Sequence, residues 1–235
     1  MKRRFILLSG SLLALSFILF LVSRSRSFQL MGELINRVPT ERRAIALTID
    51  DGPTRRTPYL LEVLRQANIK ATFFVLGASL EKEPELAKAI VSEGHELGNH
   101  TYSHPLMLLR SFSFIDNQIT RTDALIRKAG HQGPIHFRAP GSKKLFMLPY
   151  YLKKSGRKHI LFDLEPDSYP SVAKDPDAIV KYALENARPG SILLLHGMYE
   201  GNDASVKAIP GIVSGLRNQG YEFLTVNQLL SSSTN

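Results

Sequence analysis

Short apolar runs and amphipathic segments take turns along most of this chain. The apolar runs predict β-strands, at residues 44–50, 70–77, 95–100, 135–140, 158–166, 191–197 and 221–226. Between them, apolar residues recur three or four positions apart, which is the period of a helix packed on one face. These segments predict helices at residues 57–69, 83–94, 113–130, 148–156, 176–190 and 204–220 (interrupted by Pro210), and a short one from residue 227.

The order of the elements predicts the fold class. Strand and helix alternate about seven times within about 195 residues, and apolar strands joined by helices indicate a parallel sheet. We therefore expect an α/β fold, a distorted (β/α) barrel with about seven parallel strands. An open, doubly wound sheet is the alternative. The first strand is not followed by the G-x-G-x-x-G motif of dinucleotide-binding proteins.

The first 26 residues have a different pattern from the domain. Phe5–Val22 is a run of 18 residues without a charge, with three bases before it and Arg24 and Arg26 after it. This length lies between the apolar part of a signal peptide and a short membrane-spanning helix, and no small-residue cleavage pattern follows. We expect an uncleaved signal-anchor (a transmembrane segment) over residues 1–26, a connector over 27–41 and one domain over 42–235.

The bases around this run predict its orientation. The N-terminal side carries more of them, which favours a cytoplasmic N-terminus and a domain outside the cytoplasm, in the periplasm or at the cell surface. Cleavage of the segment would instead give a secreted protein.

Composition limits the partners and the chemistry. The formal net charge is +9, but five of the 30 bases flank the N-terminal run. The rest of the chain therefore has 25 bases and 21 acids, which is close to charge balance. No basic run is interleaved with aromatic residues, and we therefore expect no nucleic acid partner. The chain has no cysteine, which excludes disulfides and thiolate ligands. Any metal would be held by His, Asp or Glu.

Polar residues lie at or just beyond the carboxyl ends of several predicted strands. They are Asp50, Asp51, His100, His104, Arg138, Asp167 and His196. In a parallel barrel the carboxyl ends of the strands meet on one face, so these seven side chains are expected to share one pocket. His100 and His104 have a spacing that suits two ligands of one metal ion on one turn. Two neighbouring carboxylates at a strand end diverge, so one can bind a metal while the other acts as a base.

Each of these residues also has a purely structural interpretation. The two aspartates could cap a helix before a turn, the two histidines could lie on an exposed turn, His196 could be a hydrogen-bonded core residue, and Arg138 could pair with an acid. The expectation that they share one face favours function. For His95, His131, His136 and His159, at strand starts or in loops, we expect no role in the site.

Five short motifs occur in one order along the domain. They are TIDDG (48–52), HTYSH (100–104), FRAP (137–140), FDLEPDS (162–168) and LLLH (193–196). In these motifs the chain resembles the polysaccharide deacetylase family, the carbohydrate esterases (family 4) that share a NodB-homology domain. The resemblance covers nearly all of residues 42–230 and implies a distorted (β/α) barrel, in agreement with the strand pattern.

The resemblance also implies roles for the polar residues. Asp51, His100 and His104 would bind a divalent metal, usually zinc. Asp50 would be the general base and His196 the general acid, with Arg138 orienting Asp50 and Asp167 supporting His196 or Arg138. Leu193 would line the pocket for the acetyl methyl group. Such a site activates a water and protonates the leaving amine of an acetylated sugar.

The chain departs from the family pattern at two positions. Gly141 replaces the aromatic residue that often follows the motif-three proline, although its backbone N–H can still serve as an oxyanion donor. The fourth motif commonly ends in Asp-Trp and here continues from Asp167 to Ser168 and Tyr169. Both changes concern the part of the site that shapes the substrate.

The sequence therefore predicts a metal-dependent hydrolase that removes N-acetyl groups from an amino sugar in a cell-envelope polysaccharide of the peptidoglycan or chitin type. Its expected partners are this acetylated glycan and, through the N-terminal helix, the membrane. The alternatives are an O-acetyl esterase, a deacetylase or deformylase of a lipid-linked sugar, and a non-catalytic carbohydrate-binding domain. Loss of Asp50 or His196 would mark the last of these, and both are present.

Overall fold

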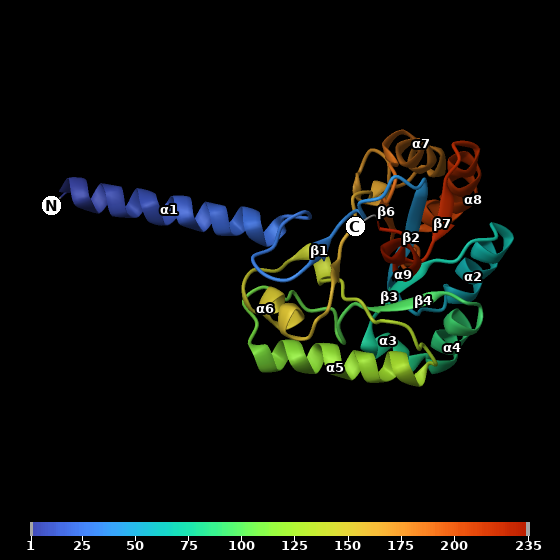
Figure 1. The fold of residues 1–235 in the computed structure, drawn as a ribbon, viewed down its shortest axis with the longest axis horizontal. Coiled ribbons are helices and arrows are strands. Elements are labelled where there is room, and N and C mark those ends of the chain that lie inside the picture. The colour runs from blue at the N-terminus through green and yellow to red at the C-terminus, as the bar shows by residue number, and fades with distance from the viewer. Residues whose placement is uncertain (1, 234–235) are drawn as a thin grey trace.

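Parallel strands form the centre of the fold in the computed structural model, which describes the backbone of residues 2–233 and the side chains of residues 11–233. The strands are β1 (Leu34–Ile35), β2 (Ala44–Gly52), β3 (Thr72–Val75), β4 (Glu96–Asn99), β5 (His159–Ile160), β6 (Ile192–Leu195) and β7 (Glu222–Leu224). Helices surround them (Figure 1). These are α1 (Lys2–Arg24), α2 (Thr57–Gln66), α3 (Gly77–Lys82), α4 (Pro84–Ser92), α5 (Phe112–Lys128), α6 (Met147–Lys154), α7 (Pro176–Asn186), α8 (Asp203–Asn218) and α9 (Val226–Ser231).

The strands follow one another round a ring. Regular ladders give the order β4-β3-β2-β6, with β7 beside the start of β2, and a separate ladder joins β1 to β5. Single parallel bridges connect these groups, from Asn99 to Phe137, from Phe137 to His159, and from Leu164 to Leu193. This α/β arrangement of parallel strands is consistent with the distorted barrel expected from the sequence.

Two of the predicted strands are much shorter than expected. Residues 135–140 contribute only the bridges of Phe137, and residues 158–166 contain the two-residue β5 and the bridge of Leu164. Pro134 and Pro140 flank the first segment, and proline has no N–H to donate to a ladder. The ring is therefore least regular on this side.

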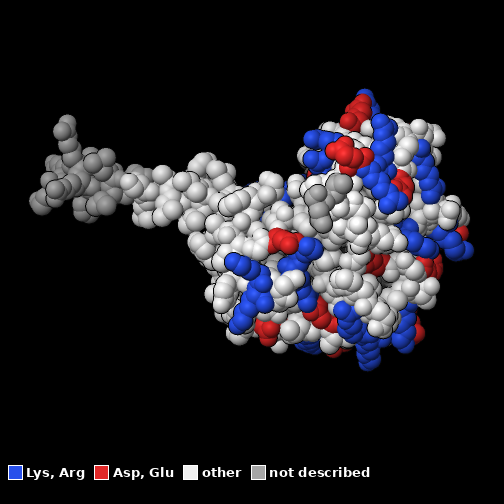
Figure 2. Space-filling view, viewed as in Figure 1, with Lys and Arg blue, Asp and Glu red and all other residues white. Residues whose placement is uncertain are grey.

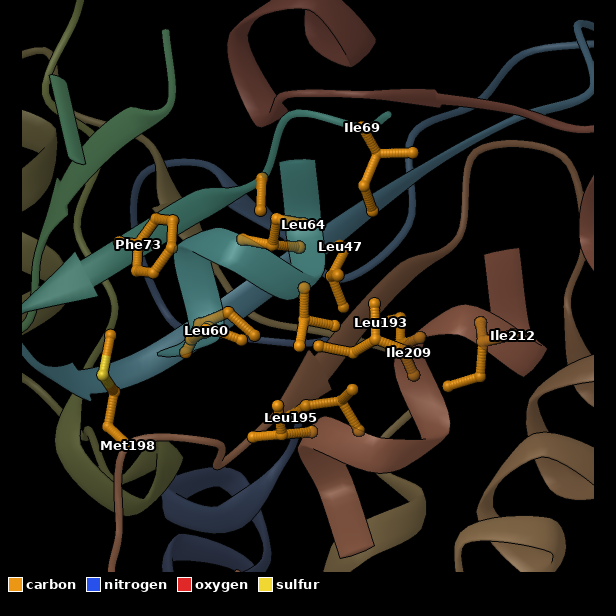
Figure 3. Packing of buried hydrophobic residues seen from close by; sticks show 14 of the residues in the cluster. Leu47, Leu60, Leu64, Ile69, Phe73, Leu193, Leu195, Met198, Ile209 and Ile212 are labelled. Atoms are coloured by element: carbon orange, nitrogen blue, oxygen red, sulfur yellow. The ribbon is translucent and has the colours of Figure 1, made fainter. Parts of the chain in front are cut away.

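Alternation along the strands produces two apolar layers. Ala46 on β2 and Leu194 on β6 point to the inside of the ring, where they join a cluster with Phe74. Their neighbours Leu47 and Leu193 point outward and pack under the helices, with residues of α2 and α8 (Figure 3). Successive side chains of a strand point to opposite faces, so one strand supplies both layers.

The predicted helices are present with small differences at their ends. Ser111 caps α5 through its side chain, which accepts a hydrogen bond from the N–H of Phe114. α8 is not interrupted at Pro210 but continues through it. Proline removes one helical hydrogen bond, and the buried side chains Ile209 and Val213 on either side keep α8 packed on the sheet. α3 was not predicted, because Gly77 was assigned to the preceding strand and residues 78–82 to no element.

The N-terminal helix α1 extends away from the domain (Figure 1). The side chains of residues 1–10, on which part of the signal-anchor prediction depends, lie outside the described residues. Among the residues that the structure describes, no helix has both the length and the apolar character needed to cross a bilayer.

The predicted connector, residues 27–41, packs against the domain. It contributes β1 to the sheet, and Val38 is buried with the inner cluster. Gln29 Oε1 lies 2.8 Å from Nδ1 of His159, a buried histidine. The chain therefore passes from α1 into the fold without a free linker.

Candidate active site

A bulge at the end of β2 brings two carboxylates into one pocket. Asp50 is in register with Phe74 and Gly52 with Val75, so Asp51 is an extra residue between two pairs. Asp51 has a φ of 71°, in the left-handed region. A regular strand would point Asp50 and Asp51 to opposite faces. The bulge re-aims the second side chain, and both carboxylates line the same cavity.

His100 and His104 lie in the loop after β4, the strand predicted to end at residue 100. Thr101 and His104 have positive φ values of 74° and 56°, which fold the loop back on itself. Gln118 of α5 holds this loop, since its Oε1 accepts a hydrogen bond from the N–H of Tyr102 at 3.0 Å. The two imidazole rings consequently face each other, with centroids 5.1 Å apart.

Three donor atoms converge between these elements. Oδ1 of Asp51 lies 3.4 Å from Nε2 of His100 and 3.2 Å from Nε2 of His104, and the three residues each offer a ligand atom within 4.8 Å of the others. Oδ1 of Asp51 is buried without a hydrogen-bond partner in the described part of the chain. Zinc ligands at tetrahedral angles and about 2.0–2.1 Å from the ion lie roughly 3.3 Å apart. The donor set therefore fits a small divalent cation such as zinc.

The protonation of His100 suits a metal ligand. Its Nδ1 lies 2.9 Å from the carbonyl oxygen of Arg138, and a proton assigned to Nδ1 leaves the Nε2 lone pair directed at Asp51. Burial lowers the pKa of His100 below its usual value, against the opposing effect of Asp50 and Asp51. The ring is accordingly neutral near pH 7.

Asp50 has a different partner from its neighbour. Nη1 of Arg138 donates to Oδ1 of Asp50 at 2.7 Å and to the hydroxyl of Thr48 at 2.9 Å. Its remaining nitrogens donate to the carbonyl oxygens of Ile160 and Leu161, both at 3.1 Å. Arg138 is fully buried, and this set of acceptors fixes its guanidinium. One oxygen of Asp50 is thus held in place while the other faces the cavity.

His196, at the end of β6, forms the opposite wall. Its Nδ1 lies 3.1 Å from Oδ1 of Asp167, and its backbone N–H donates to Oδ2 of the same carboxylate at 2.6 Å. Ser205 also donates to this carboxylate, at 2.8 Å. Burial alone lowers the pKa of His196, but the hydrogen bond and charge of Asp167, with Asp50 and Glu165, raise it to about 9. The ring is therefore an imidazolium near pH 7.

These side chains line one cavity of about 270 Å³. All the predicted polar residues except Arg138 and Asp167 lie on its surface, and those two lie directly behind it, each hydrogen-bonded to a lining side chain. Asp167 is hydrogen-bonded to His196, and Arg138 to Asp50. Gly141 lines the cavity with a φ of 56°.

The prediction for Leu193 requires a correction. Its side chain points away from the cavity into the core beneath α8 (Figure 3), while Leu194 lines the cavity. The reason is the alternation of a strand, because Leu194 shares its face of β6 with His196. That parity is visible in the sequence and could have identified Leu194.

Sequence reasoning missed four polar residues of the cavity, Arg26, Ser142, Glu165 and Tyr199. Tyr199 follows His196 by three positions and stacks on it, with ring centroids 6.5 Å apart. Burial and the charge of Asp51 raise the pKa of Tyr199, which keeps its phenol neutral. Glu165, inside the fourth motif, forms an ion pair with Arg26, a residue of the N-terminal segment that also lines the cavity. Only the position of Glu165 within a motif could have indicated its place.

The remaining histidines lie outside the cavity, in keeping with the prediction that they have no role there. His95 packs edge-on against Phe73, and its Nδ1 accepts a hydrogen bond from the N–H of Ala71 at 3.0 Å. His159 is fully buried, and its Nε2 accepts from the N–H of Ala139 at 3.2 Å. Burial lowers the pKa of His159 to about 3, so it is a neutral structural residue.

Known proteins share this sequence and architecture. The family model described as polysaccharide deacetylase matches residues 37–159. A peptidoglycan-N-acetylglucosamine deacetylase of Bacillus cereus is 36% identical over 202 residues, which are 85% of this chain and 93% of that protein.

Two solved structures are similar as well. A crystal structure of the Bc1960 peptidoglycan N-acetylglucosamine deacetylase in complex with a small molecule has a TM-score of 0.78 at 32% identity, covering 84% of this chain and 92% of the other. A pseudoenzyme of carbohydrate esterase family 4 from Bacillus anthracis has a TM-score of 0.74 at 25% identity, covering 86% and 70%. The architecture thus occurs both in deacetylases and in a relative described as a pseudoenzyme.

Proposed function

The chain belongs to the polysaccharide deacetylase family and is a carbohydrate deacetylase, and we propose that its substrate is an N-acetylated amino sugar of a cell-envelope polysaccharide. The observation that carries this proposal is the pairing of Asp50 and His196 across one cavity, beside the donor set of Asp51, His100 and His104. An amide is hydrolysed only when a water loses a proton and the leaving amine gains one. The two walls of the cavity offer a group for each transfer.

We assign the metal site to Asp51, His100 and His104. A divalent ion such as zinc, when bound there, supplies Lewis-acid activation of the acetyl carbonyl. The neutral His100 and the unpartnered Oδ1 of Asp51 support this assignment.

Asp50 is the proposed general base. Arg138 occupies one of its oxygens, so the oxygen that faces the cavity is left to accept the proton of the attacking water. The full burial of Arg138 and its backbone acceptors favour a fixed orientation for Asp50. Arg138 is thus a positioning residue for the base.

His196 is the proposed general acid. An imidazolium held by Asp167 can donate its Nε2 proton to the leaving amine, without which the C–N bond does not break. The N–H of Gly141 donates to no acceptor in the described chain, which leaves it for the developing oxyanion. Leu194 is the proposed contact of the acetyl methyl group.

Acetate release from N-acetylglucosamine oligomers tests the proposal. The full chain in detergent is needed, since a form that begins at Ser27 would lack Arg26 of the cavity. We expect release with zinc, loss with a chelator, and loss in Asp50→Asn with the metal retained. Asp203→Asn removes an exposed carboxylate outside the cavity and serves as the matched control.

Other outcomes of the same assay identify the alternatives. Metal binding without release from oligomers, but with release from O-acetylated or lipid-linked sugars, would replace the substrate and keep the site. Metal-independent glycan binding without any release would indicate a non-catalytic domain like the pseudoenzyme relative. The presence of both Asp50 and His196 favours catalysis over that last outcome.

We further propose that the domain lies outside the cytoplasm, attached through residues 1–26. The uncharged run of 18 residues with bases on both sides supports this location. Carbonate extraction of membranes and protease treatment of spheroplasts test it. Release of the chain by carbonate, or protection of the domain in spheroplasts, would contradict it.

A further inference from the structure

Three segments around the base of α1 have an unusual composition. Residues 23–32, 105–114 and 141–154 contain seven bases and no acid. They also hold seven of the ten exposed large hydrophobic side chains that the structure describes after α1. The seven are Phe28, Leu30, Leu106, Leu109, Phe146, Met147 and Tyr150. The other three are tyrosines, scattered over the domain.

The three segments form one continuous surface, which we name the basic apolar face. The backbone N–H of Lys144 donates to the carbonyl of Ser23 at 3.2 Å, which joins the first segment to the third. Lys154 lies over the ring of Phe112, with Nζ 5.2 Å from the centroid, and Phe112 packs on Tyr150 at 6.2 Å. These contacts join the second segment to the third.

The face lies on the side of the domain from which α1 leaves. α6 and the first turn of α5 lie on this side (Figure 1), and Lys and Arg side chains gather over α6 (Figure 2). The axis of α1 points outward from the same side. A flat partner that covers this face would therefore lie across the base of α1.

Most bases of this face lack acidic partners. Arg24, Arg110, Lys143, Lys153 and Lys154 form no ion pair with any described residue, whereas Arg26 is paired with Glu165. Some exposed bases elsewhere are paired, as in Lys88 with Glu85 and Arg121 with Glu81. Unpaired cations beside exposed aliphatic and aromatic side chains create a surface that is complementary to an anion-bearing apolar partner.

We propose that the basic apolar face docks on an anionic lipid bilayer. Lys and Arg are attracted to anionic headgroups, and Leu, Phe and Tyr side chains insert at the boundary between headgroups and acyl chains. Leu109, with 80% of its surface exposed, and Phe146 are the side chains that insert. An anionic protein would satisfy the charges but would not need seven scattered apolar side chains, which fit a fluid surface.

Docking places the catalytic cavity at the membrane. Gly141 lines the cavity and belongs to the face, and a Cβ at its position would lie 3.9 Å from Leu106 and 3.8 Å from Lys143. Arg26 likewise lines the cavity and belongs to the face. The cavity therefore opens at the edge of the docked surface, and acetylated sugars close to the headgroups are the ones it reaches. This consequence rests on the proposed function, whereas the docking itself does not.

A probe on the face tests the proposal without interference from α1. The chain has no cysteine, so Leu109→Cys carries a single environment-sensitive fluorophore, and Ser214→Cys on α8 is the control on the opposite side of the domain. The full chain is reconstituted into phosphatidylcholine bilayers with and without phosphatidylglycerol. We expect a blue shift and quenching by a spin-labelled lipid at position 109 only, and only with phosphatidylglycerol.

Charge removal and salt separate the proposal from other causes. The triple variant Arg110→Gln, Lys153→Gln, Lys154→Gln should lose the signal, as should 1 M salt, where the screening length is about 3 Å. The matched variant Lys88→Gln, Lys181→Gln, Lys207→Gln removes the same charge from outside the face and should keep it.

Three results would overturn the proposal. They are a probe at 109 that stays in water in both bilayers, one that inserts equally without phosphatidylglycerol, and one that becomes shielded in detergent as the protein concentration rises. The last would identify a second copy of the chain as the partner. Acetate release from soluble oligomers is expected to be unchanged in both triple variants, so failure of docking and failure of catalysis are distinguishable.

Discussion

The cavity has two walls that use the same residue type in opposite ways. On one wall, burial lowers the pKa of His100, and its Nδ1 is hydrogen-bonded to a backbone carbonyl. On the other, His196 is half-buried, its Nδ1 faces the carboxylate of Asp167, and its pKa rises to about 9. Burial therefore keeps the His100 ring neutral, whereas at His196 the hydrogen bond and charge of Asp167 outweigh burial.

This difference supports the roles proposed for the two histidines. A neutral imidazole has a lone pair to give to a metal ion, whereas an imidazolium has a proton to give to a leaving group. The proposed mechanism needs one of each within one cavity. Burial leaves His100 neutral, and the carboxylate of Asp167 keeps the proton on His196.

The largest effect is expected on the metal wall. His100→Ala should abolish zinc binding and lower acetate release by about 10³-fold, because Lewis-acid activation contributes several kcal/mol and each 1.36 kcal/mol is tenfold. Zinc content and acetate release are measured together. His131→Gln, which changes a histidine outside the cavity, is the control. Full activity in a zinc-free His100→Ala protein would remove the metal from the account.

The acid wall should respond differently. His196→Gln is expected to lower kcat by about 10²- to 10⁴-fold, the contribution of a general acid. Its zinc content should equal that of the unchanged protein, since His196 is not among the three donors. Parallel loss of zinc would show that the two walls are not independent.

A smaller change is expected when only the partner of His196 is altered. The folded pKa of about 9 lies above the usual 6.5, so the proton is retained, and activity persists, until the pH rises through about 9. Asp167→Asn removes the hydrogen-bonded charge and should move the alkaline limb of kcat/KM downward, toward 6.5. If the alkaline limb of Asp167→Asn stays near pH 9, Asp167 is not the source of the raised pKa of His196.

The same pKa predicts how stability depends on pH. A group whose folded pKa is raised stabilises the fold fully below its unfolded pKa, and this contribution disappears as the pH rises through the folded value. The thermal stability of the unchanged chain should therefore fall between about pH 6.5 and 9, and that of Asp167→Asn should fall less. Equal pH dependence in the two proteins would be the contrary result.

The smallest effect on catalysis concerns two adjacent leucines. Leu193→Ala and Leu194→Ala should each lower the free energy of unfolding by about 2–5 kcal/mol, since both side chains are buried in the core. Only Leu194→Ala should also lower kcat/KM of the folded protein, by about tenfold, through loss of the contact with the acetyl group. Kinetics of the two folded variants distinguish them, and the reverse assignment would restore the sequence prediction for Leu193.

The sequence predicted the site better than the details of the fold. Asp50, His100 and His196 follow strands, and the rule that parallel strand ends share a face was enough to bring them together. The bulge at Asp51 was not predictable, because one extra residue leaves no periodic signal. The strand predicted at 135–140 is nearly absent because Pro134 and Pro140 flank it.

Contacts between distant segments were also beyond the sequence. Arg26 reaches the cavity because the N-terminal segment packs on the domain, and its partner Glu165 lies 139 positions away. No local pattern marks such a pair. By contrast, Leu194 was within reach, since counting back from His196 in steps of two gives the residue on the same face of the strand.

The opposite charge states of the two histidines are the central claim, and nitrogen NMR of the imidazole side chains tests it most directly. At pH 7.5, in the metal-free chain, we expect His196 as an imidazolium and His100 as a neutral ring with its proton on Nδ1. Addition of zinc should shift Nε2 of His100 and leave His196 charged. A neutral His196, or a protonated His100, at that pH would contradict the account.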